Sequence, residues 1–408
     1  MLVVQKYGGS SVADAERIFN VAGRIAECYD QGNDVVVVLS AQGDTTDDLI
    51  AKAAEIDPNA SKREMDMLLS TGEQQSVALM AMALNKMGYA AVSLNAMQVG
   101  ISTTSEYSNA KIKLISRGRI EQELERKNIV IVTGFQGINK YEDITTLGRG
   151  GSDTSAVAIA AALRADKCEI YTDVNGVYTA DPRIVKDARK IDEISYSEMA
   201  ELASLGAKVL HTRSVEIAQK YNVELVVRSS LTREEGTVIK GENSVEKILV
   251  SGVASDKDVA RVTIEGIDDK PGKAFEVFAL FDKTKITVDI IIQPIGRGGT
   301  NDISFTIEKS SLKNVIQLLE EYKEKLGAKK ITFDDKIAKV SIVGAGMATH
   351  SGVASLMFEA LYDAGVNIKM ISTSEIKISV LIDEKDEESA LIAIHDKFQL
   401  AMQSLRQN

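Results

Sequence analysis

The chain opens with Val3-Val4-Gln5-Lys6-Tyr7-Gly8-Gly9-Ser10-Ser11-Val12, a hydrophobic strand followed by two glycines and by hydroxyl residues at the start of a predicted helix. Gly8 and Gly9 allow the backbone to approach an anion, the free N–H groups of a helix start point toward it, and Lys6 supplies a positive charge. The stretch is therefore a candidate phosphate-binding turn, although the same pattern also forms ordinary tight turns. It is not a Walker P-loop, because the lysine precedes the glycines.

Length and composition predict a multidomain α/β protein. With 408 residues the chain is too long for one hydrophobic core and is expected to form two or three domains. Hydrophobic residues make up 44% of it, and 29 glycines accompany only 4 prolines, which is typical of folded α/β proteins. The net charge of −11 argues against binding to nucleic acid or to a membrane. Small anionic ligands must therefore meet local basic residues.

The cysteines and the hydrophobic runs indicate a cytoplasmic protein. Cys28 and Cys168 lie far apart with no CxxC motif, so the sequence offers neither a disulfide framework nor a zinc site. The hydrophobic run at residues 35–39 is too short for a signal sequence or a membrane span. We therefore expect a reduced, cytoplasmic location.

Residues 1–243 alternate strand-like and helix-like segments, which predicts an open, mostly parallel sheet with helices on both faces. The expected strands are residues 2–6, 34–40, 91–95, 129–133, 169–172 and 224–228. A first amphipathic helix from Val12 repeats hydrophobic residues on one face as far as Tyr29 and stops at Gly32. Ligands of such sheets bind beyond the carboxyl ends of the strands.

The remainder of the chain contains an internal repeat. Residues 259–266 align with residues 337–344, a spacing of 78, and each copy reads as strand, helix, strand, strand, helix. This order fits two ferredoxin-like βαββαβ domains. The expected boundaries are residues 1–243 for the first domain, 256–335 for the first copy and 336–408 for the second, with 241–247 as a linker and 246–255 as a candidate extra strand of the second copy.

A second glycine-rich segment, Leu147-Gly148-Arg149-Gly150-Gly151-Ser152-Asp153-Thr154, precedes a helix expected at residues 157–164. Arginine can clamp a carboxylate or a phosphate with two parallel hydrogen bonds, so this segment is a second candidate anion site. Asp153 either caps the helix or orients an ammonium or a metal-bound phosphate, and the sequence leaves both interpretations open.

Two loops after expected strands add further polar residues. Residues 40–49 carry hydroxyls that can hold a carboxylate, although Thr and Asp are also common helix caps. Residues 171–183 follow another strand, and there Tyr178 can line a base pocket and Arg183 can reach phosphates. Taken singly, neither loop identifies a function.

Taken together, the segments resemble those of aspartokinases. The matching segments, in order, are residues 6–12, 40–49, 70–73, 148–153 and 171–183, and residues 365–376 resemble the paired ACT domains of that family. The resemblance covers essentially the whole chain. It implies an amino-acid-kinase fold that transfers the γ-phosphoryl group of ATP, with Mg²⁺, to the β-carboxylate of L-aspartate, the first step of lysine, threonine and methionine biosynthesis. A carboxylate is already ionised at neutral pH and needs no general base, which suits a chain with only 3 histidines.

The resemblance also implies roles for single residues. The expected catalytic residues are Lys6, Arg149 and Asp153, with Lys6 stabilising the phosphoryl group during transfer. The expected aspartate-binding residues are Ser40, Thr45, Glu73, Arg149, Gly150, Gly151 and Ser152, with Glu73 on the α-ammonium. The expected ATP-binding residues are Lys6, Gly8, Gly9, Ser10, Thr172, Asp173, Tyr178, Arg183 and Lys208. No metal site built from side chains is expected. Asp44 and Asn175 depart from the family pattern, since many relatives carry a basic residue and an aspartate there.

ACT domains of this family bind amino-acid end products, so the repeat is expected to bind an inhibitor, with lysine favoured and threonine second. The expected effector residues are Asp269, Gly272, Ala274, Asp289, Gln293, Val353, Ala354, Asn367, Ile368, Thr373 and Ser374. Ala354 lacks a hydroxyl that some relatives have. Exposed sheet edges in the repeat also predict a homodimer or larger homo-oligomer through the ACT domains.

Two alternatives to an aspartokinase stay open. A related enzyme of the same fold takes another acceptor, as glutamate, acetylglutamate and uridylate kinases do, but the loop at residues 40–49, Glu73 and the double repeat argue against it. A catalytically inactive amino-acid sensor would keep the repeat and lose the kinase function. The presence of Lys6, Arg149 and Asp153, the expected catalytic residues, argues against such an inactive sensor.

Overall fold

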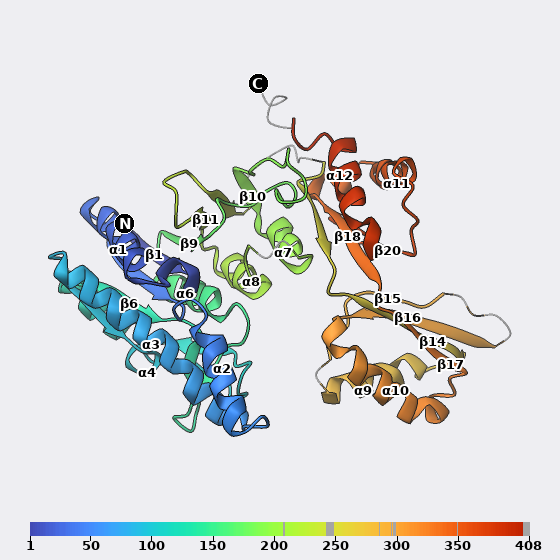
Figure 1. Cartoon of the computed structure of the whole chain (residues 1–408), viewed down its shortest axis with the longest axis horizontal. Coiled ribbons are helices and arrows are strands. Elements are labelled where there is room, and N and C mark those ends of the chain that lie inside the picture. The colour runs from blue at the N-terminus through green and yellow to red at the C-terminus, as the bar shows by residue number, and fades with distance from the viewer. Residues whose placement is uncertain are drawn as a thin grey trace. The chain divides into compact units, whose positions relative to one another are not determined.

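The computed structural model of the chain describes residues 1–206, 209–241, 249–284, 286–294, 296, 299–348 and 350–402 (Figure 1). The chain forms two units. The N-terminal unit consists of Met1–Tyr178 and Lys190–Val245, and the C-terminal unit consists of Thr179–Arg189 and Glu246–Asn408. The expected linker at residues 241–247 lies almost wholly outside the described residues, so its role stays a prediction, as do the domain boundaries.

The N-terminal unit is built on an eight-stranded sheet with the order β10-β12-β11-β9-β1-β2-β6-β3. Its strands are β1 (Leu2–Tyr7), β2 (Asp34–Leu39), β3 (Ala91–Leu94), β6 (Ile129–Thr133), β9 (Lys167–Thr172), β10 (Glu193–Ser195), β11 (Leu225–Ser229) and β12 (Thr237–Lys240). Every neighbouring pair is parallel except β11 and β12. The expected mostly parallel sheet and its six expected strands are confirmed.

Helices cover both faces of this sheet. On one face, α1 (Ala15–Asp30) and α3 (Lys62–Lys86) share a hydrophobic core with Val35 and Val37 of β2. Val36 and Val38 point to the opposite face and are also fully buried, and α6 (Gly151–Leu163) contacts β1 and β2 there. The other helices of the unit are α2 (Thr45–Ile56), α4 (Ala96–Val99), α5 (Gly118–Glu125), α7 (Tyr196–Ser204) and α8 (Thr212–Tyr221). No helix in the described ranges is both long and apolar enough to cross a membrane.

Two helix starts differ from the prediction. A short 3₁₀ turn, η1 (Gly9–Val12), follows the first strand, and α1 begins only at Ala15, because the Asp14 side chain caps it by accepting a hydrogen bond from the Arg17 backbone N–H at 2.9 Å. The helix expected from residue 157 begins at Gly151 instead. Its first five residues include the buried hydroxyl residues Ser152, Thr154 and Ser155, and the Ser155 hydroxyl donates to the Gly151 carbonyl at 2.9 Å.

A second sheet in the N-terminal unit was not expected. It has four short strands in the order β5-β4-β7-β8, with β4 (Ile101–Thr103), β5 (Ile112–Ile115), β7 (Gln136–Ile138) and β8 (Ile144–Thr146). Strand β8 leads directly into the glycine-rich segment around Arg149. This small sheet therefore carries one of the candidate anion-binding segments.

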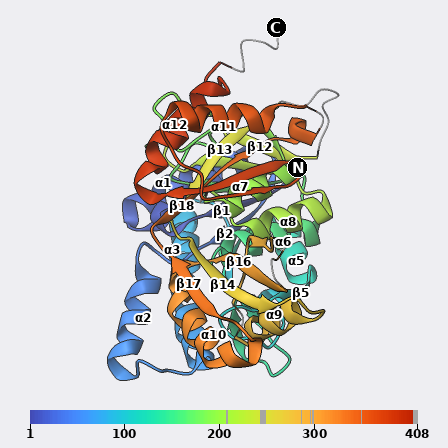
Figure 2. The same ribbon diagram turned by 90° about the vertical axis from the view of Figure 1, so that its right-hand side faces the viewer.

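The C-terminal unit contains two four-stranded antiparallel sheets, which confirms the ferredoxin-like repeat. The first repeat consists of β14 (Ala260–Asp268), α9 (Lys273–Thr284), β15 (Ile291–Ile292), β16 (Thr300–Ile307), α10 (Leu312–Leu326) and β17 (Lys330–Asp334). The second consists of β18 (Ile337–Val343), α11 (Val353–Asp363), β19 (Met370–Thr373), β20 (Lys377–Asp383) and α12 (Glu387–Lys397). Its fourth strand is β13 (Gly252–Asp256), which precedes the first repeat and pairs with β18. Helices α11 and α12 pack side by side on this sheet (Figure 2).

Residues 179–189 belong to the C-terminal unit although the chain on either side of them belongs to the N-terminal unit. Ala180 and Val185 lie in the hydrophobic core of the second repeat. The Thr179 hydroxyl lies 3.0 Å from Nε2 of the buried His395 on α12. The loop expected to bind nucleotide is therefore divided, with Tyr178 in one unit and Arg183 in the other.

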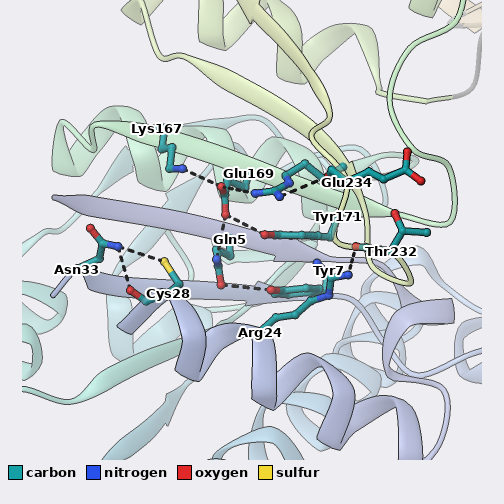
Figure 3. A network of polar contacts seen from close by, with 11 residues as sticks. Gln5, Tyr7, Arg24, Cys28, Asn33, Lys167, Glu169, Tyr171, Thr232 and Glu234 are labelled. Carbon is teal, nitrogen blue, oxygen red and sulfur yellow. Dashed lines mark hydrogen bonds and ion pairs between the residues drawn. The ribbon is translucent and has the colours of Figure 1, made fainter. Parts of the chain in front are cut away.

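A buried polar network joins the central strands of the eight-stranded sheet (Figure 3). The Glu169 carboxylate on β9 accepts hydrogen bonds from Gln5 at 2.9 Å and from the Tyr171 hydroxyl at 3.0 Å, and it pairs with Lys167 at 2.9 Å and Arg228 at 3.4 Å. Burial alone would raise the pKa of Glu169, but these donors and charges hold it below its ordinary value. The network therefore depends on an ionised carboxylate.

We expect Glu169→Gln to lower the free energy of unfolding at pH 7 by about 1–3 kcal/mol, because Lys167 and Arg228 lose a buried negative partner. Folding lowers the pKa of Glu169, so its contribution is present above the unfolded pKa of about 4.3 and is lost as the pH falls through the folded value. Urea unfolding at pH 7 and at acid pH measures both effects. The control is Glu27→Gln, which removes an exposed pair with Arg233. Equal losses for the two variants would contradict the prediction.

Candidate active site

A cavity of about 220 Å³ lies in the N-terminal unit, where the chain leaves β1 and β2. Parallel strands end at the same edge of a sheet, so the loops that follow them meet there. The lining residues are Lys6, Ser40, Thr46, Glu73, Phe135, Gly148, Arg149, Gly150, Gly151, Ser152 and Asp153. Segments up to about 150 positions apart in sequence therefore share one small, strongly polar space.

Lys6 and Asp153 form an ion pair inside this cavity. The Lys6 ammonium on β1 lies 2.7 Å from the Asp153 carboxylate in the first turn of α6, and the two side chains are 12% and 13% exposed. A β-carbon added at Gly8 would lie 3.6 Å from the Lys6 ammonium, so the glycine leaves the space above that nitrogen open. A partly buried ammonium held by one carboxylate keeps donors free for an incoming anion.

The turn after β1 is locked to the loop after β2. A β-carbon added at Gly9 would lie 2.5 Å from the Ala41 carbonyl oxygen, so only glycine fits. The Gly43 N–H donates to the Gly9 carbonyl at 3.0 Å, and the Ser40 N–H donates to the Tyr7 carbonyl at 3.2 Å. The two loops predicted separately from the sequence thus form one surface beside Lys6.

Glu73 is buried in the wall of the cavity with one oxygen unsatisfied. It is 3% exposed on α3, and its Oε1 accepts a hydrogen bond from the Ala41 N–H at 3.2 Å. Its Oε2 is buried and has no hydrogen-bond partner among the described residues. Burial raises the pKa of Glu73 to about 7, partly offset by the backbone hydrogen bonds that the carboxylate accepts. Such a group is suited to binding a ligand ammonium.

Arg149 sits on a loop whose shape depends on its glycines. Gly148 and Gly150 have φ angles of 77° and 66°. A β-carbon at Gly150 would lie 2.3 Å from the β-carbon of His211, whose pKa is lowered by burial, so that imidazole is neutral near pH 7. Arg149 itself is exposed, and the part of the chain that the structure describes offers it no ion pair. Its guanidinium is available to an anion.

The sequence analysis missed two lining residues. Phe135 has a φ of 68°, a conformation unusual outside glycine, and its N–H donates to the Ser155 hydroxyl at 3.1 Å. The glycines on either side of it, at positions 134 and 137, were an available signal of a special backbone. Thr46 lines the cavity in place of the predicted Thr45, whose methyl group lies beside Gly72 on α3.

The residues predicted for ATP are only partly brought together. Thr172 and Asp173 follow β9, the neighbour of β1, and the Thr172 hydroxyl donates to Asp173 at 2.8 Å. Tyr178 lies in the same unit, where its backbone forms an isolated antiparallel β-bridge with Lys190. Arg183 lies in the C-terminal unit and pairs with Asp181 at 2.6 Å. Lys208 lies outside the described residues, and Ser10 is exposed within the 3₁₀ turn η1.

In the first repeat, a cavity of about 200 Å³ gathers part of the predicted effector residues. It is lined by Ile267, Asp268, Lys270, Gly272, Lys273, Ala274, Gln293, Asn301 and Ile303. The predicted Asp269 accepts a hydrogen bond from the lining residue Asn301 at 2.7 Å. The predicted Asp289 instead pairs at 2.6 Å with Lys339, a buried lysine of the second repeat.

In the second repeat, the predicted effector residues have mixed environments. Val353 is buried in the core, where Ala354 and Ile368 pack against it. Asn367, Thr373 and Ser374 are exposed near β19. Their exposure leaves the polar groups accessible to a ligand.

Comparison with known proteins agrees with this arrangement. The family model of the amino acid kinase family matches residues 1–229, and an ACT domain model matches residues 340–398. The aspartokinase of Corynebacterium glutamicum is 51% identical over 405 residues, which cover 98% of this chain and 96% of that protein. The chain also resembles the structure of Escherichia coli aspartokinase III in complex with aspartate and ADP in the R-state, with 26% identity, a TM-score of 0.82, and coverage of 97% and 99%. The T-state structure of that enzyme in complex with lysine and aspartate gives a TM-score of 0.76 at 26% identity, over 97% and 99% of the two chains. The chain belongs to the aspartokinases, enzymes of the amino acid kinase family that carry ACT domains.

Proposed function

We propose that this aspartate kinase transfers the γ-phosphoryl group of ATP to the β-carboxylate of L-aspartate, giving 4-phospho-L-aspartate, at the cavity that contains Lys6, Glu73 and Arg149. The product places the enzyme at the first step of lysine, threonine and methionine biosynthesis. The observation that carries the proposal is the unsatisfied Glu73 carboxylate in the same small space as a guanidinium without an ion pair among the described residues. An amino acid offers an ammonium and a carboxylate to match these two groups.

In the proposed complex, Glu73 binds the α-ammonium of aspartate, while Arg149 and the hydroxyls of Ser40 and Thr45 or Thr46 bind carboxylates. The backbone of Gly150, Gly151 and Ser152 completes this side at the start of α6. Because the attacking β-carboxylate is ionised at neutral pH, the enzyme has to align two anions rather than remove a proton.

On the phosphoryl side, Lys6 stabilises the group in transfer and Asp153 orients Lys6 through their ion pair. Gly8, Gly9 and Ser10 supply the backbone cradle, and Thr172, Asp173, Tyr178, Arg183 and Lys208 are proposed for the nucleotide. Mg²⁺ bound to the ATP phosphates would neutralise part of their charge. The described ranges hold no group of three or more His, Cys, Asp or Glu side chains arranged for a metal.

We propose that the C-terminal unit binds lysine, and with lower preference threonine, as a feedback inhibitor. The cavity of the first repeat contains Gly272, Ala274 and Gln293, and the related aspartokinase III was solved with lysine. The other predicted effector residues, in both repeats, are part of the same proposal. A ligand inhibits only if it binds the inactive arrangement more tightly than the active one. Assembly into a homodimer or larger homo-oligomer through the ACT domains, and a cytoplasmic location, stay predictions.

Replacement of Lys6→Met should lower kcat by about 10²–10³-fold, because the transferring group loses its closest cation. The matched control is Lys52→Met on the exposed face of α2, which should leave kcat unchanged. Steady-state kinase assays with aspartate and ATP, together with thermal melts to confirm folding, give the result. A folded Lys6→Met protein with wild-type kcat would remove the assigned role.

The raised pKa of Glu73 predicts a pH-dependent KM for aspartate. Below about pH 7 the carboxyl is protonated and no longer attracts an ammonium, so KM at pH 6 should be about tenfold higher than at pH 8. Glu73→Gln should give a high KM that does not vary with pH. Because the folded pKa is raised, the empty site loses stability as the pH rises, and Glu73→Gln should raise the melting temperature at pH 8 more than at pH 5. An unchanged pH profile in the variant would refute the assignment.

Lysine added to the assay should inhibit the kinase, and Gln293→Ala should raise the lysine concentration needed by about tenfold through loss of polar contacts. Gln317→Ala, on the exposed face of α10 in the same repeat, is the control. Assays with lysine, threonine or both separate the effectors. Inhibition by threonine alone would overturn lysine as the effector, and turnover of glutamate without turnover of aspartate would overturn the acceptor.

A further inference from the structure

Helix α3 contacts three separate segments of the active-site wall through one buried face. Asp66, Ser70 and Glu73 follow one another at helical spacing on this face and are at most 3% exposed. Glu73 binds the Ala41 N–H, as described above, and the Ser70 carbonyl accepts a hydrogen bond from the Gln136 side chain at 3.0 Å. The seven residue steps from Asp66 to Glu73 span about 10 Å of helix.

Asp66 is fully buried and accepts five hydrogen bonds from only two residues. Its Oδ1 accepts from the Ser108 N–H at 3.1 Å, the Ser108 hydroxyl at 3.2 Å and the Thr146 hydroxyl at 2.8 Å. Its Oδ2 accepts from the Ser108 N–H and the Thr146 N–H, both at 2.8 Å. Asparagine would lose the negative charge and keep only one accepting oxygen. Its amide nitrogen would face two N–H donors at the Oδ2 position, and at the Oδ1 position the Ser108 and Thr146 hydroxyls would have to turn and accept.

These bonds fix the backbone that leads to Arg149. Thr146 is the last residue of β8, and three residues later the chain reaches Arg149. Ser108 also supports Gly148, where an added β-carbon would lie 3.0 Å from the Ser108 carbonyl oxygen. Arg213 donates from the other side, to the Leu147 carbonyl at 3.1 Å and to the Ala110 carbonyl at 2.9 Å.

The Arg149 side chain, by contrast, has no ion pair among the described residues to orient it. Its position therefore follows from the clamped backbone on which it sits, and that backbone is tied to α3 through Asp66. Glu73 is fixed by the same helix. Helix α3 therefore sets the distance between Arg149 and Glu73.

We propose that Asp66 is a positioning residue for the kinase reaction: through Thr146 and Ser108 it holds Arg149 at a fixed distance from Glu73, so that α3 measures the length of the acceptor and favours aspartate over the longer glutamate. This inference rests on the proposed roles of Glu73 and Arg149 in binding the acceptor. A displacement of one ångström at a reacting group can lower a rate about 10²-fold. Loss of the hydrogen bonds from Ser108 and Thr146 to Asp66 should therefore change the kinetics by a measurable amount.

The test is Asp66→Asn, with Glu64→Gln on the exposed start of α3 as control. We expect KM for aspartate to rise about tenfold or more, KM for ATP to stay within about twofold, and the ratio of kcat/KM for aspartate over glutamate to fall about tenfold. Thr146→Val, which removes one of the five bonds, should show the same pattern with smaller changes. It also decides the question if Asp66→Asn does not fold.

A double-mutant cycle with Arg149→Ala separates positioning from general stability. If Asp66 acts through Arg149, Asp66→Asn should change KM for aspartate by less than about twofold in the Arg149→Ala background. An equal rise in both backgrounds, or equal rises in KM for aspartate and ATP, or an unchanged KM in folded Thr146→Val, would overturn the proposal. If Arg149→Ala itself leaves KM for aspartate unchanged, the proposed binding role of Arg149 fails instead.

Discussion

Burial of charge at the carboxyl ends of β1 and β2 is the constraint on which the site depends. A charged group removed from water must find an opposite charge, find hydrogen bonds or shift its pKa. Lys6 meets Asp153, and Asp66 meets the donors of Ser108 and Thr146. One oxygen of Glu73 has no hydrogen-bond partner among the described residues, and burial raises the pKa of this carboxyl to about 7. Glu73 is therefore the group that we propose binds the ligand ammonium.

The parallel part of the eight-stranded sheet was predictable, although β10 and β12 were not, because strands such as β2 and β6 are runs of Val and Ile that are buried on both faces. Such runs, bounded by turns and separated by helices, leave few alternatives to a parallel sheet. The start of α6 was not predictable in the same way. Ser152, Thr154 and Ser155 look like loop residues in sequence, but in the fold they are buried and two of their hydroxyls bond to the carbonyls of the preceding turn.

The cavity lining was predictable where glycines mark a special backbone conformation, and it was not predictable where side chains distant in sequence support it. Asp66 and Thr146 are 80 positions apart, and no local pattern links them. Thr45 and Thr46 differ only in which side of a helix start they face, which depends on how α2 packs on α3. The loop at residues 171–183 reads as one motif, yet the chain passes from one unit to the other within it.

The raised pKa of Glu73 reaches beyond catalysis. An ionised carboxylate buried in the cavity wall lowers the free energy of unfolding as long as the site is empty. An ammonium ligand removes this cost when it binds. Proteases act on transiently unfolded molecules, so occupancy of the proposed acceptor site would lengthen the lifetime of the enzyme. If Glu73 has its proposed role, the carboxylate that binds the amino acid also links the stability of the enzyme to the supply of its substrate.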